Sequence, residues 1–148
     1  MDIMRQTALQ LQQIVERSED RLLVFTEAGS ESRPSSTKWS RKEVLGHLID
    51  SASNNHQRFV RAQLRGELVF PSYAQEDWNR IQQYQSETWA NLVRLWASYN
   101  LHLAHVIEGI PESAAGNRCT IGEHEPMTLQ SLVIDYVKHL EHHLAQIR

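Results

Sequence analysis

Hydrophobic residues recur at helical spacing in four long stretches, and polar segments separate them. In the first stretch Leu11, Ile14 and Val15 share one face, and in the third Trp89, Leu92 and Trp96 do so. No convincing pair of strands is evident. The pattern predicts four helices over residues of about 2–27, 40–66, 86–108 and 128–148. We therefore expect an all-α protein, a four-helix bundle formed by one domain over residues 1–148.

Local signals set the predicted helix ends. Ser40 is a good N-cap, and Glu43 three residues later completes a capping box at the start of the second helix. Gly109 followed by Pro111 predicts the end of the third helix. Thr128 is expected to cap the fourth.

The three connections are longer than minimal bundle turns. Residues 67–85 are predicted to be irregular or briefly helical, and residues 112–127 to form a polar loop. The aromatic segment from Phe70 to Trp78 could form a wall or lid over a substrate, or simply pack over one end of the bundle. Long connections at one end of a bundle could thus cover a site.

Composition and charge argue against several classes of partner and site. The formal charge of −3 at pH 7 gives no basic field, so nucleic acid and anionic membranes are not expected partners. Cys119 is the only cysteine, which excludes an intrachain disulfide and a cysteine-rich zinc site. The first residues resemble no signal peptide, and no apolar run approaches the roughly 20 residues of a membrane helix. A cytoplasmic protein is the simplest expectation.

Two histidines in the last helix carry the strongest chemical signal. His139 and His143 are four residues apart and therefore lie one above the other on one helix face. His143 falls within the apolar stripe of this helix and His139 at its edge, whereas His142 points elsewhere. This spacing allows two imidazoles to bind one metal ion, but two half-buried, hydrogen-bonded histidines would give the same pattern.

The periodicity leaves His47 of the second helix open. It lies off the apolar stripe, on a polar face shared with Ser51, Asn54 and Arg58. Such a face is wet on a surface helix but lines a polar pocket inside a bundle. Taken alone, His47 is best interpreted as a surface histidine.

The remaining histidines have weaker signals. His102 and His105 lie off the apolar stripe of their helix and are expected in solvent, as is the loop residue His124. His56 falls nearer the core face and could be a hydrogen-bonded core histidine or a residue that supports a metal ligand.

The chain resembles the DinB/YfiT-like superfamily of small bacterial proteins over nearly its whole length. The resemblance rests on residues 39–51 (WSRKEVLGHLIDS), on Met127-Thr128-Leu129 and on residues 135–143 (DYVKHLEHH). One histidine in the second helix and a His-x-x-x-His near the C-terminus look like the metal triad of this family. The resemblance therefore implies His47, His139 and His143 as metal ligands.

The resemblance also implies an up-down-down-up bundle, often dimeric, with a divalent metal such as zinc or nickel; manganese also accepts imidazole. We expect a small-molecule substrate and a homodimer. The leading functional hypothesis is a mononuclear metalloenzyme that transfers a low-molecular-weight thiol of the bacillithiol or glutathione type. The alternatives are a metal-dependent hydrolase and a non-catalytic, dimeric metal-binding module of the stress response.

Three polar residues near the histidines are candidates for orienting an imidazole through its second nitrogen: Asp50, Asn54 and Asp135. A filled fourth coordination position, for instance by His124, would favour a structural metal. An open position would favour an enzyme.

Overall fold

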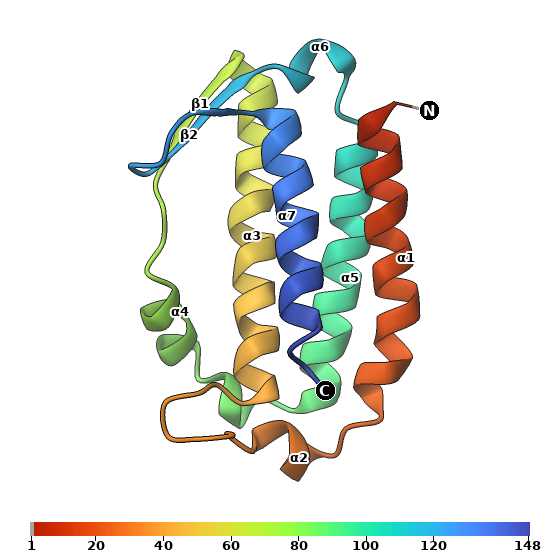
Figure 1. Cartoon of the computed structure of the whole chain (residues 1–148), viewed down its shortest axis with the longest axis vertical. Coiled ribbons are helices and arrows are strands. Elements are labelled where there is room, and N and C mark those ends of the chain that lie inside the picture. Colours follow the sequence, from red (N-terminus) through yellow and green to blue (C-terminus); the bar gives the residue numbers. More distant parts are fainter. Residues whose placement is uncertain (1) are drawn as a thin grey trace.

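The computed structural model describes residues 2–148 and consists mainly of four long helices packed as a bundle (Figure 1). They are α1 (Ile3–Leu23), α3 (Arg41–Arg65), α5 (Trp89–Glu108) and α7 (Leu129–Leu144). Helices α1 and α7 run in one direction and α3 and α5 in the other, which gives the expected up-down-down-up order. Each of α5 and α7 packs against both α1 and α3.

One continuous hydrophobic core fills the bundle. Side chains that are fully buried come from all four long helices, and they include Leu11, Leu45, Phe59, Trp96, Leu103 and Leu129. The apolar stripes predicted in the first and third helices are thus core faces, because all six residues named for them are buried. Among the described residues, no helix has both the length and the apolar character needed to cross a membrane.

The helix ends follow the predicted signals closely. The Ser40 side chain accepts a hydrogen bond from the Glu43 backbone, and the Glu43 side chain accepts one from the Ser40 backbone. Gly66 ends α3 in the left-handed region, at φ 72°, where glycine is favoured. Thr128 caps α7 by accepting from the Ser131 amide at 3.1 Å.

The first helix is shorter than predicted. It ends at Leu23, and the chain then forms the short helix α2 (Glu27–Glu31). The Thr26 side chain caps α2 by accepting from the Gly29 amide at 3.0 Å. The apolar residues Val24 and Phe25 continue the pattern beyond the end of α1, and the new N-cap at Thr26 then begins a separate helix.

The expectation that the chain lacks paired strands is wrong. A three-stranded sheet crosses one end of the bundle, with β1 (Glu67–Phe70) parallel to β2 (Arg118–Ile121) and β2 antiparallel to β3 (Met127–Thr128). The strands have at most four residues, and β1 pairs with a segment about fifty positions later. Such short strands have no measurable alternation, and the long-range parallel pairing of β1 with β2 leaves no hairpin signal. The predicted loop 112–127 also contains the short helix α6 (Glu112–Ala115).

The connection from α3 to α5 lies along the outside of α3. It contains β1, helix α4 (Gln75–Gln82) and the 3₁₀ turn η1 (Tyr84–Ser86). The Tyr84 ring packs directly on Gly46, where an added Cβ would lie 2.1 Å from a ring carbon. The Tyr84 hydroxyl donates to the Asp50 carboxylate at 2.6 Å. Gly46 therefore permits the close packing of η1 on α3.

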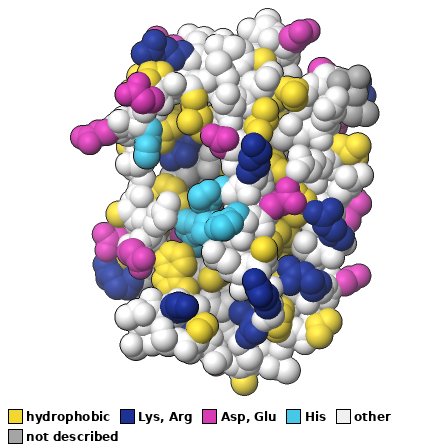
Figure 2. Space-filling view, viewed as in Figure 1, with side chains coloured by type: hydrophobic (Ala, Val, Ile, Leu, Met, Phe, Trp, Pro, Cys, Tyr) yellow, Lys and Arg dark blue, Asp and Glu magenta, His cyan; other side chains and the backbone are white. Residues whose placement is uncertain are grey.

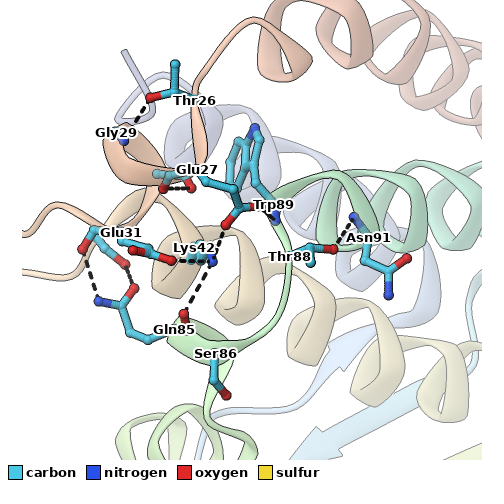
Figure 3. Close-up of polar contacts among 12 residues, drawn as sticks. Thr26, Glu27, Gly29, Glu31, Lys42, Gln85, Ser86, Thr88, Trp89 and Asn91 are labelled. Atoms are coloured by element: carbon cyan, nitrogen blue, oxygen red, sulfur yellow. Dashed lines mark hydrogen bonds and ion pairs between the residues drawn. The ribbon is translucent and has the colours of Figure 1, made fainter.

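A buried lysine ties α2 and η1 to the start of α3 (Figure 3). Lys42 is 1% exposed, and its Nζ lies 2.8 Å from Glu27 and 3.1 Å from Glu31. It also donates to the Gln85 carbonyl at 3.2 Å. Glu27 in turn accepts from the Trp89 amide, so this cluster joins four elements.

Candidate metal centre

Three histidines from two helices meet at the contact between α3 and α7. One nitrogen from each of His47, His139 and His143 lies within 4.8 Å of those of the other two. The ring centres of His47 and His143 are 4.9 Å apart, and those of His139 and His143 are 4.6 Å apart. The i, i+4 spacing aligns the pair on α7, and the packing of α3 on α7 supplies the third imidazole.

Burial favours the neutral imidazoles that a metal ion needs. His47 is 3% exposed, and its burial, with the charges of His143 and His139, lowers its pKa to about 4. Burial also lowers the pKa of His143, although a hydrogen bond with Gln146 partly opposes this. His139 is exposed and forms the solvent side of the cluster.

One nitrogen of the cluster has no partner. His47 Nδ1 is buried and makes no hydrogen bond within residues 2–148. The Trp39 ring packs 5.4 Å from the His47 ring and helps to cover it. A buried polar atom without a partner costs free energy unless a ligand or water satisfies it. The donor set of three imidazoles, with one buried and unpaired nitrogen, therefore fits a divalent metal ion.

A cleft of about 330 Å³ opens beside the histidines. In Figure 2 histidine side chains gather at the centre of the face that carries α3 and α7, next to a hollow. Polar residues of α3 form one wall of the cleft, and residues of α7 form another. The α3–α4 connection and the residues around β2 and β3 form the remaining walls. The polar lining comprises His47, Ser51, Asn55, Arg58, Ser72, Tyr73, Gln75, His124, Glu125, Asp135, Tyr136 and His139, and the apolar lining Ile121, Met127 and Leu132.

The polar face of α3 thus lines a pocket and does not face bulk water. His47, Ser51 and Arg58 belong to the face that the periodicity left open, and the covering segments decide its environment. Arg58 is only 8% exposed, although its residue type alone would suggest a surface arginine. Its position one turn after Asn54, on the same polar face, was the only available signal.

Of the three residues expected to orient an imidazole, Asp50 and Asn54 form hydrogen bonds elsewhere and Asp135 lines the cleft. Asp50 accepts hydrogen bonds from Tyr84 and, at 2.8 Å, from Gln82, while its Oδ2 is buried without a partner. Its burial raises the pKa of the carboxyl, against the effect of both hydrogen bonds. Asn54 donates to the Asp50 carbonyl. Asp135 is exposed and lines the cleft one helical turn before His139.

Part of the aromatic segment reaches the cleft. Tyr73 lines it, and burial together with the charge of Asp50 raises the pKa of Tyr73 to about 12. Trp78 is 39% exposed and packs on Tyr73, with ring centres 5.2 Å apart. Tyr73 therefore stays protonated at neutral pH and presents a hydroxyl to this space.

The other histidines lie outside the cluster. His102 and His105 are exposed on α5, as predicted, and His142 is exposed on α7. His56 is half-buried, and its Nδ1 lies 2.9 Å from the Tyr99 hydroxyl, which fits a hydrogen-bonded histidine. His124 is exposed and lines the cleft but does not belong to the three-histidine group.

Comparison with known proteins agrees with this architecture. The family model of the DinB superfamily matches residues 10–147. A solved structure described as YfiT from Bacillus subtilis, a probable metal-dependent hydrolase with an unusual four-helix bundle topology, superposes with a TM-score of 0.86. It is 17% identical in sequence, and the match covers 96% of this chain and 82% of that one. No curated protein matches the chain. With nearly all of its length matched by the family model, the chain belongs to the DinB superfamily.

Proposed function

We propose that the protein is a mononuclear metal-dependent hydrolase whose ion is held by His47, His139 and His143. The observation that carries the proposal is the convergence of three imidazole nitrogens within 4.8 Å at the edge of a cleft. The solved structure with the same fold is described as a probable metal-dependent hydrolase, which supports the same class of reaction.

The ligand number favours a catalytic role over a structural one. Structural zinc sites normally have four protein ligands, whereas catalytic sites have three and an open position. Among the described residues, no further histidine, cysteine, aspartate or glutamate joins the three histidines in one group. His124, the candidate for a fourth ligand, remains outside that group. A non-catalytic metal-binding module is therefore the weaker proposal.

The residues around the cleft suggest a division of roles. A divalent ion at the histidines would lower the pKa of a water or thiol and supply a nucleophile. Asp135, exposed on the cleft wall one turn before His139, is placed to accept a proton from that nucleophile. The Tyr73 hydroxyl, which is protonated at neutral pH, can donate a hydrogen bond to a substrate oxygen.

The size of the cleft bears on the thiol transferase that the sequence favoured. A volume of about 330 Å³ is at the lower end of the range for small-molecule sites. It suits one small substrate and water better than a tripeptide-sized thiol together with an electrophile. We therefore place hydrolysis first and retain thiol transfer as the second candidate, with the same histidines.

Metal content measured by elemental mass spectrometry tests the proposal. Protein purified without a histidine tag should contain about one zinc, nickel or manganese ion per chain. The double variant His139→Ala His143→Ala should lose it, whereas His102→Ala His105→Ala, which removes two exposed histidines of α5, should retain it. Absence of metal from the wild type, even after incubation with each ion, would refute the proposal.

The reaction class is tested on the metal-loaded protein. Ester and amide substrates should be hydrolysed without added thiol, and the activity should disappear in the double histidine variant. Turnover that requires glutathione or bacillithiol would establish the transferase instead. The Asp135→Asn variant should lower kcat by about 10²-fold or more without a loss of bound metal.

A further inference from the structure

Arg58 is a buried cation for which the protein provides no anion. Its side chain lines the cleft, and the residue is 8% exposed. Its Nε is buried without a hydrogen-bond partner, and across residues 2–148 its guanidinium makes no hydrogen bond or ion pair. Its described contacts are with the Phe70 ring, whose centre lies 5.6 Å from Cζ, and electrostatically with Tyr73.

This arrangement is costly for the free protein. Guanidinium has five N–H donors and stays charged in proteins, and the buried Nε–H of Arg58 forfeits hydration that nothing replaces, whereas the two terminal nitrogens are not fully buried and remain available to a ligand in the cleft. The buried carboxylate of the same helix is not its partner, because Asp50 Oδ1 is bound by Tyr84 and Gln82 and no ion pair joins Asp50 to Arg58. An unsatisfied cation in a cleft that also contains a candidate catalytic site indicates a ligand that carries the missing anion.

The position of Arg58 relates this anion to the histidines. Arg58 follows His47 by eleven residues, which is three helical turns, so both side chains lie on one face of α3, about 16 Å apart at Cα. Ser51 and Asn55 lie between them and also line the cleft.

The charges around the cleft favour a single negative charge. Besides the histidines, Arg58 is the only cationic residue among the lining side chains, and Glu125 and Asp135 are acidic. A phosphate dianion would face these two acids with one compensating cation. A carboxylate matches one planar guanidinium with two parallel hydrogen bonds, and the resulting pair is neutral.

We propose that Arg58 binds a carboxylate of the substrate, and that the protein acts on small molecules in which a carboxylate lies apart from the bond that reacts at the histidines. The proposal specifies the substrate class of the proposed hydrolase. It rests on that function only for the reaction at the histidines. Anion binding by Arg58 does not require the metal. Arg58 is a specificity-determining residue in this scheme and takes no part in proton transfer.

The test uses metal-free protein, so that a carboxylate cannot bind through an ion. NMR titrations follow the backbone amide signals of Ser51 and Asn55, which line the cleft in every variant, and in the wild type also the Arg58 Nε–H signal, assigned by its loss in Arg58→Lys. The three probes are 4-phenylbutyrate, its neutral amide and phenyl phosphate. We expect saturable millimolar binding of 4-phenylbutyrate, with the amide about tenfold weaker or worse. Arg58→Met should weaken the carboxylate by about tenfold, Arg58→Lys less, and Arg65→Met, an exposed arginine of the same helix, not at all.

Several results would overturn the proposal. They are equal binding of the carboxylate and its amide, unchanged binding in a folded Arg58→Met variant, absence of binding by every probe, and tighter binding of phenyl phosphate. Circular dichroism establishes that each variant is folded. Metal content of Arg58→Met should equal that of the wild type, so failure of the carboxylate site and failure of the metal site give different results.

Discussion

Lys42 and Arg58 are both buried cations of helix α3, but the protein satisfies only one of them. Lys42 has two carboxylates and a carbonyl within 3.2 Å, one for each of its N–H donors (Figure 3). Burial opposes its charge, but the hydrogen bonds and charges of Glu27 and Glu31 raise its pKa overall. Arg58 has no such partners, and burial lowers its pKa.

The difference separates a structural charge from a functional one. The cluster at Lys42 is complete without a ligand and joins α2, α3 and η1 at one end of the bundle. The cleft toward the other end leaves His47 Nδ1 and Arg58 Nε unpartnered. A buried polar atom without a partner costs free energy, and both of these atoms belong to residues that line the cleft, so we infer that a ligand supplies the missing partners. Four predictions test this contrast.

Replacing Lys42 should give the largest effect on stability. Lys42→Met removes three contacts and leaves two carboxylates close together, so we expect a loss of about 3–4 kcal/mol in the free energy of unfolding. The partial exposure of Glu27 and Glu31 keeps the loss at the lower end of the range for buried pairs. Urea denaturation measures it. Metal content and carboxylate binding should not change. A change in either would show that the Lys42 cluster and the cleft are coupled.

His47 should make the metal-free protein sensitive to acid. Its pKa falls from an ordinary value of 6.5 to about 4 on folding, so the unfolded chain binds the proton more tightly. Stability should therefore decline as the pH falls from about 6.5 to about 4, by about 3 kcal/mol from this group. Thermal or urea unfolding across this range measures the slope.

The matched control for this slope is His105, which is exposed on α5. His47→Gln should flatten the pH dependence of the free energy of unfolding, whereas His105→Gln should leave it unchanged. An equal slope in wild type and His47→Gln would contradict the assignment of a buried neutral imidazole.

Gly46 lies on α3 between Lys42 and Arg58, and this position should not tolerate a side chain. Alanine favours helix by about 1 kcal/mol over glycine, but a Cβ here would overlap the Tyr84 ring at 2.1 Å. We expect Gly46→Ala to destabilise the fold by about 2 kcal/mol through overpacking. Gly116→Ala, where no atom lies within 4 Å of an added Cβ, should be neutral in the same denaturation experiment.

Replacing Arg58 should have the smallest effect on stability and the opposite sign. Arg58→Met removes an unpaired buried charge and keeps much of the side-chain volume, so we expect a stability gain of about 1 kcal/mol or less. A loss as large as that of Lys42→Met would show that Arg58 has a structural role after all. Chemical denaturation of both variants under the same conditions gives this comparison directly.

Much of the fold could be predicted from local chemistry. The apolar stripes, the capping box of Ser40 and Glu43 and the N-cap at Thr128 gave the four long helices within a few residues. Short strands were missed because β1 and β2 pair across about fifty positions, and such long-range pairing leaves no local pattern. The end of α1 at Leu23 was missed because the apolar residues Val24 and Phe25 continue beyond it, up to the second N-cap at Thr26.

The candidate site likewise has features that the sequence predicts and features that depend on tertiary packing. The sequence determined that His139 and His143 share one face, because helix geometry alone sets an i, i+4 pair. It determined equally that His47 and Arg58 share a face of α3. Only the tertiary structure decided that this face is enclosed, because the packing of α3 on α7 and the segments across the cleft come from distant parts of the chain. Burial, shifted pKa and a missing partner are properties of that packing and cannot be read from one helix.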